Sequence, residues 1–153
     1  MLKALRRLLD DTASDAGAAR FERRPLHLAV ATLLQESTRV DLESHPAERT
    51  AAGRALAELF GLEAAECEAL LAEACEKAGR LTSYFAQVSV IKREFSLEQR
   101  IQLIQHLWCI AYAHGPLDQY EDHFVRKIAH LLYIPNTQVM LARSRARPAK
   151  TVS

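Results

Sequence analysis

The stretch SLEQRIQLIQHLWCIAYAHGPLDQYEDHFVRKIAHLL, residues 96–132, decides the fold class. It opens with Ser96 and Gln99 at the spacing of a capping box, which predicts the start of a helix. A polar corner follows, and Asp118 is a favourable N-cap residue for a second helix. Apolar residues recur at helical spacing in both segments: Ile101, Ile104, Leu107, Trp108 and Ala111, then Phe124, Val125, Ile128, Leu131 and Leu132. The stretch predicts two helices joined by a short corner.

The rest of the chain shows the same helical period. Five glycines and five prolines divide it, and we expect further helices at about 2–10, after Pro25, at 46–60, at about 63–78, at about 83–93 and after Pro135. In the last of these, Asn136 or Thr137 would be the cap. The run Val88–Ile91 has strand propensity, but we predict a helix there too. The fold class is therefore all-α, a bundle of seven or eight helices.

Composition narrows the class of protein. The 153 residues are 49% hydrophobic and 25% charged, which is typical of a globular chain and excludes a disordered or fibrous one. The net charge of +1 indicates no polyanionic partner. No apolar run is long enough to span a bilayer, and Leu2–Leu9 does not resemble a secretory signal. Three cysteines without a C-x-x-C pair favour a reduced, cytoplasmic protein.

The chain divides into three expected parts. Residues 1–24 form an N-terminal helix and a basic linker, residues 25–147 form the helical domain, and residues 148–153 form a disordered tail. Basic residues gather in the first part and near the tail, while 41–76 is acidic. Solvated charge is the simplest interpretation of both, and contact of the basic ends with nucleic acid or an anionic membrane is the weaker alternative.

An internal repeat appears when the chain is laid on itself at an offset of 73. Asp41 then aligns with His114 and Glu48 with Glu121. Small residues of the first copy align with larger residues of the second: Ala51, Ala52 and Ala55 align with Phe124, Val125 and Ile128. Exchanges of this kind keep the volume of a shared core constant. We therefore predict a pseudo-duplicated pair of helix hairpins.

The corners of this repeat carry a resemblance to a known family. The second corner, Ala111–Glu121, reads AYAHGPLDQYE, and the first, Asp41–Glu48, reads DLESHPAE. They resemble the corner Ala-x-Ala-Asp-Gly-x-Leu-Asp-x-x-Glu of the TerB-like tellurite-resistance family. His114 replaces the first Asp in the second corner, and His45 replaces the second Asp in the first. The resemblance extends over about Leu26–Arg145.

This resemblance implies an all-helical bacterial domain without established enzymatic activity. It is linked to tellurite and stress resistance, with acidic corners proposed to bind metal. On this basis we expect a non-enzymatic interaction or scaffold module. A protein partner is expected, a homodimer is one option, and neither nucleic acid nor membrane contact is expected.

The corner residues have two physical interpretations. Capping explains Asp118 with Glu121 as a second capping box, and His45 before Pro46 with Glu48 in the first turn. A metal site is the alternative, with Asp41, His45, Glu48, His114, Asp118 and Glu121 as its candidate ligands. Mixed imidazole and carboxylate ligands favour Zn²⁺, Mn²⁺, Fe²⁺ or Ni²⁺ over Ca²⁺ or Mg²⁺. A divalent ion is thus the one candidate cofactor.

Enzymatic motifs are absent from the sequence. It contains no Gly-rich phosphate loop, nucleophile elbow or His-Glu-x-x-His motif, and we predict no catalytic residues. The alternative function is a metal-dependent hydrolase that uses His114, Asp118 and Glu121. Cys67 and Cys75 are predicted to be buried structural thiols, and His123 and His130 to be surface residues.

Overall fold

The computed structural model describes residues 23–38, 46–78, 83–113 and 115–148. Within them the chain forms seven helices and no strand, which confirms the all-α prediction. The first helix covers residues 23–38. It is followed by α2 (Pro46–Phe60), α3 (Ala64–Ala78), α4 (Phe85–Glu94), α5 (Leu97–Tyr112), α6 (Gln119–Leu131) and α7 (Asn136–Ala146). The expected helix at 2–10 and most of the expected tail lie outside the described residues.

Local signals set most of the helix ends. Ser96 forms the predicted capping box: its Oγ accepts from the Gln99 N–H at 3.3 Å, and its own N–H donates to Gln99 Oε1 at 2.9 Å. Helix α2 ends at Phe60, directly before Gly61. Gly61 has a φ of 67°, a left-handed conformation that glycine adopts at little energetic cost. Val88–Ile91 lies inside α4, as predicted.

Three of the predicted details were wrong. The described part of the first helix already includes residues 23–25, so this helix does not begin after Pro25 as expected. Helix α7 has Pro135 as its N-cap, without a side-chain cap from Asn136 or Thr137. Cys75 was predicted to be buried but is exposed.

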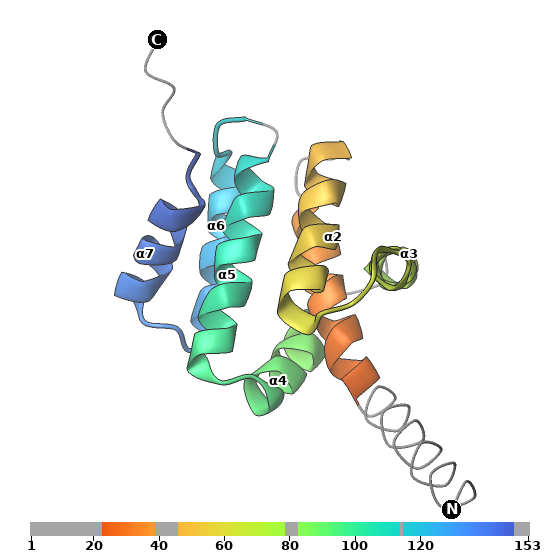
Figure 1. The fold of residues 1–153 in the computed structure, drawn as a ribbon. Coiled ribbons are helices and arrows are strands. Elements are labelled where there is room, and N and C mark those ends of the chain that lie inside the picture. The colour runs from red at the N-terminus through yellow and green to blue at the C-terminus, as the bar shows by residue number, and fades with distance from the viewer. Residues whose placement is uncertain (1–22, 39–45, 79–82, 114, 149–153) are drawn as a thin grey trace, which may run out of the picture.

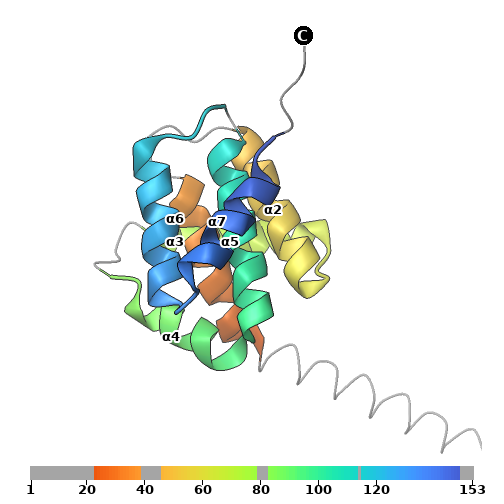
Figure 2. The same cartoon turned by 90° about the vertical axis from the view of Figure 1, so that its left-hand side faces the viewer.

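Helix α5 is the centre of the bundle. It packs against α2, α6 and α7, and Figures 1 and 2 show these helices around it. Trp108 of α5 is fully buried, and its indole N–H donates to the Val139 carbonyl of α7 at 3.2 Å. Such a bond satisfies the one polar atom of a buried tryptophan and fixes the two helices in register.

The two ends of the bundle are built from different elements. The starts of α2 and α6 lie at one end, near the top of Figure 1. Helix α4 and the end of α6 lie at the other end. None of the described helices has the length and apolar composition that crossing a bilayer requires.

Candidate functional site

The first corner leads into α2, which starts at Pro46 as predicted. Proline suits the first helical position because its missing N–H would have no partner there. Glu48 is the third helical residue and is only 1% exposed. Asp41 and His45, the other two candidate ligands of this corner, lie outside the described residues.

The second corner leads into α6, with Asp118 as its N-cap. The backbone of Asp118 is extended (φ −80°, ψ 148°), and its Oδ1 accepts a hydrogen bond of 2.8 Å from the Tyr120 N–H. The cap predicted at Asp118 is thus confirmed, with its bond on the second rather than the third helical residue. Gly115 has a φ of 141°, which is strained for any other residue. His114 lies outside the described residues.

Glu121 takes the same place in α6 that Glu48 takes in α2. It is the third helical residue and is 2% exposed. A carboxylate at this position is favoured by the helix dipole, but the dipole does not require burial. Both side chains have interaction partners in the structure. Their burial is the feature of the corners that sequence reasoning missed, although the matched spacing of 73 pointed to the pair.

The family follows from a comparison with known proteins. The model of the family described as tellurite resistance protein TerB matches residues 27–144, which is most of the chain. The chain belongs to the TerB family. The resemblance inferred from the corners is confirmed over nearly the range expected from the sequence. No curated protein and no solved structure gives a significant match, so the assignment rests on the family model.

The side chains of the two TerB-family corners include some of the ligands that a metal ion needs. Glu48 and Glu121 are buried in the first turns of α2 and α6, which begin at the same end of the bundle (Figure 1). Their carboxylates are the oxygen ligands that divalent cations take in proteins. In the part of the chain that the structure describes, no three His, Cys, Asp or Glu side chains come together as a metal site needs. A complete site therefore requires ligands from Asp41, His45 or His114.

The hydrolase alternative makes a stricter demand on Asp118. That mechanism needs its carboxylate as a ligand beside an open coordination position. Asp118 Oδ1 already accepts the Tyr120 N–H, as in an ordinary N-cap. The observed geometry at this residue is the one that capping predicts.

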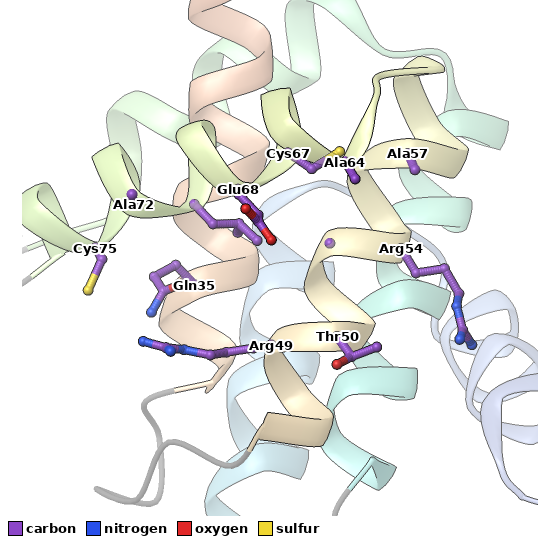
Figure 3. Close-up of a pocket in the computed structure, with 12 residues that line it drawn as sticks. Gln35, Arg49, Thr50, Arg54, Ala57, Ala64, Cys67, Glu68, Ala72 and Cys75 are labelled. Carbon is purple, nitrogen blue, oxygen red and sulfur yellow. The ribbon is translucent and has the colours of Figure 1, made fainter.

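A groove of about 690 Å³ lies between α2, α3 and the helix of residues 23–38 (Figure 3). Small residues on the facing helices keep it open, among them Gly53, Ala57 and Ala72. Arg49 extends below Gln35, and Arg54 points away from the groove. Among the described residues no histidine lines it, so none of them places an imidazole base beside its cysteines.

The two cysteines of the groove differ in exposure. Cys67 is 2% exposed, and burial raises the pKa of its thiol. Cys75 is exposed, so the prediction that both are buried was wrong for this residue. Cys75 lies at the edge of the groove between α2, α3 and the helix of residues 23–38, where its thiol is open to solvent. Both thiols, like that of Cys109, are free.

The histidines also separate into two groups. His123 and His130 are exposed, as predicted. His27 is 9% exposed, and its ring lies 4.2 Å from that of Phe60. Burial lowers the pKa of His27, and the positive charge of Arg23 lowers it further. His27 therefore takes up a proton less readily than an ordinary histidine.

Proposed function

We propose that the protein is a non-catalytic binding module of a bacterial tellurite- and stress-resistance system, and that its two corners hold a divalent metal ion. The burial of Glu48 and Glu121, at equivalent helical positions, is the observation that carries the proposal. The free cysteines agree with a place in the cytoplasm, where thiols stay reduced.

A comparison within the chain shows why burial matters here. Glu98 is also an acidic residue in the first turn of a helix, α5, yet it is exposed. An exposed carboxylate such as that of Glu98 interacts favourably with the helix dipole without any desolvation cost. Taking a carboxylate out of water costs free energy unless opposite charge or hydrogen bonds compensate. Glu48 and Glu121 have interaction partners in the structure, and a divalent cation shared by the corners would add positive charge beside both carboxylates.

The remaining ligands would come from Asp41, His45 and His114. With imidazole among the ligands, Zn²⁺, Mn²⁺, Fe²⁺ or Ni²⁺ is favoured over Ca²⁺. The ion would join the two corners at one end of the bundle and so stiffen that end for contact with a protein partner. Its role in this proposal is structural rather than catalytic.

Thermal unfolding in the presence of Zn²⁺, Mn²⁺ or Ni²⁺ tests the metal. Ligand binding stabilises the folded state by about 2.7 kcal/mol at a hundredfold excess over Kd, which raises the melting temperature measurably. His114→Ala and Glu121→Gln should both abolish the rise, whereas Asp118→Asn, which keeps most of the cap, should retain it. Glu98→Gln is the control and should keep the rise. A melting temperature that none of these ions changes would remove the metal from the proposed function.

A further inference from the structure

A second surface lies at the end of the bundle away from the corners. It is a hollow of about 440 Å³ between α4 and the end of α6, and it is lined by Tyr84, Phe85, Lys92, Lys127, His130 and Tyr133, among others. We call it the aromatic hollow. No residue of the proposed metal site contributes to it.

Apolar side chains are concentrated at the aromatic hollow. Phe85 is 76% exposed and Tyr133 is 73% exposed. Of the six large hydrophobic residues that are exposed among the described residues, three line this hollow, the third being Leu131. Single exposed apolar residues are normal on any surface, but a cluster around a concavity indicates a binding site.

The backbone of Tyr133 adopts a conformation that is energetically unfavourable for residues other than glycine. Tyr133 has a φ of 56°, in the left-handed region that a helix end usually gives to glycine. The Ile134 N–H donates to the Ala129 carbonyl at 3.1 Å and the Tyr133 N–H to that of His130 at 3.1 Å, as in a Schellman motif. Arg100 of α5 donates to the Leu132 carbonyl at 2.6 Å. These hydrogen bonds hold the end of α6 in place, and the Tyr133 ring points into solvent rather than into the core.

The charge around the aromatic hollow is positive. Lys92 Nζ lies 4.4 Å from the centre of the Tyr133 ring, and Lys127 Nζ lies 5.8 Å from that of Tyr84. No Asp or Glu lines the hollow, and neither lysine forms an ion pair with a carboxylate of the described residues. The nearby Glu36 instead accepts from the Tyr84 hydroxyl at 3.2 Å. Two ammonium groups above aromatic rings are therefore available to an anionic ligand.

From the rings and the charges together we infer that the aromatic hollow binds a short acidic peptide segment of a partner protein, with an apolar side chain of that segment as its anchor. The volume suits one or two large side chains, and the lysines would pair with carboxylates on either side of the anchor. This surface gives the proposed binding module its contact site, and it needs no metal at the corners.

Other occupants fit less well. The apolar stretch Leu2–Leu9 of this chain carries Lys3, Arg6 and Arg7 and no acidic residue, so its charge repels it from the lysines. Nucleic acid is usually bound through a larger set of phosphate contacts, on the order of six to ten. A helix that lies on a membrane presents one long apolar face, whereas Phe85, Leu131 and Tyr133 come from two separate segments around a hollow.

Fluorescence anisotropy with labelled peptides tests the inference, in the presence of EDTA so that metal plays no part. The probe is Glu-Asp-Glu-Phe-Asp-Leu-Glu, and its controls replace either the acidic residues by Lys or both apolar residues by Ala. The first peptide should bind saturably and both controls should bind about tenfold more weakly or worse. Lys92→Glu together with Lys127→Glu should weaken binding about tenfold or more. Arg145→Glu reverses one charge on α7, outside the hollow, and should leave the affinity unchanged.

Tyr133→Gly separates binding from folding. Glycine relieves the left-handed backbone, so the melting temperature should stay the same or rise, while affinity for the acidic peptide falls. Absence of saturable binding to the acidic peptide would overturn the inference. So would equal affinity of the lysine variants, or tighter lysine-dependent binding to single-stranded DNA or to phosphatidylserine vesicles. Peptide binding in EDTA without any metal effect on melting would overturn the metal proposal and leave the hollow standing.

Discussion

Glu48 and Glu121 lie 73 residues apart in the chain, yet each is the third residue of the helix after a polar corner and each is no more than 2% exposed. The same offset relates other buried positions of the two helix pairs. Matched pairs in which both members are fully buried are Val30 with Leu103, Ala31 with Ile104, Leu34 with Leu107, Ala52 with Val125, and Ala55 with Ile128. These are positions that the internal duplication, which remains a prediction from the sequence, would relate.

The duplication predicts a superposition. In an experimental structure, the helix of residues 23–38 with α2 should superpose on α5 with α6 with matching helix directions. Glu48 should then fall on Glu121, and each small residue of α2 on its larger counterpart in α6. Unrelated crossing angles in the two pairs would show that the offset arose by coincidence.

The cap of α6 predicts a stability change at Asp118. Asp118→Ala should lower the free energy of unfolding by about 0.5–2 kcal/mol in metal-free buffer, because the Tyr120 N–H loses its acceptor. Asp118→Asn should retain most of the stability, since asparagine caps nearly as well. Urea denaturation measures both. Equal losses in the two variants would mean that the negative charge, and not the cap bond, is what the corner requires.

Much of the fold could be predicted because its signals are local. Pro46 and Gly61 mark the ends of α2, and Ser96 with Gln99 marks the start of α5. The periodicity shows which face of a helix is apolar, but it does not show how closely a neighbouring helix covers that face. Cys75 and Phe85 are exposed for this reason, although both lie at positions with helical apolar spacing.

The candidate site was less predictable for a related reason. First-turn glutamates such as Glu48 and Glu121 have a sufficient local explanation in capping, and only the packed bundle distinguishes them from the exposed Glu98. The aromatic hollow joins α4 to the end of α6, two segments about forty residues apart. No sequence pattern relates Phe85 to Tyr133.

The exposure of the cysteines predicts their order of reaction. Cys75 should react with a thiol reagent at nearly the rate of a free cysteine, because it is open to solvent. Cys67 and Cys109 should react more slowly, since burial raises the pKa of both thiols and lowers the fraction present as thiolate. Mass spectrometry after timed alkylation gives the order. Early labelling of Cys67 would contradict the packing of α3 against the bundle.

The burial of His27 predicts a pH dependence of stability. Its pKa is lowered in the folded state, mainly by burial, so the unfolded chain binds a proton first as the pH falls below about 6.5. Acidification through this range should therefore reduce the free energy of unfolding. Burial lowers the pKa of His106 too, which adds to the loss. In His27→Leu the loss between pH 7 and pH 5 should be smaller, as urea denaturation at each pH would show. If His27→Leu loses as much unfolding free energy on acidification as the unmutated protein, the pKa of His27 is not lowered by folding.

The measurement that bears most directly on the proposed function is the metal content of the natively purified protein, without an affinity tag that binds metal. We expect a divalent transition ion in stoichiometric amount. Glu48→Gln and Glu121→Gln should each lose it, and the matched first-turn variant Glu98→Gln should keep it. A folded, unmutated protein that carries no such ion and takes none up from solution would contradict the proposal, and the buried glutamates would then be structural residues of the corners alone.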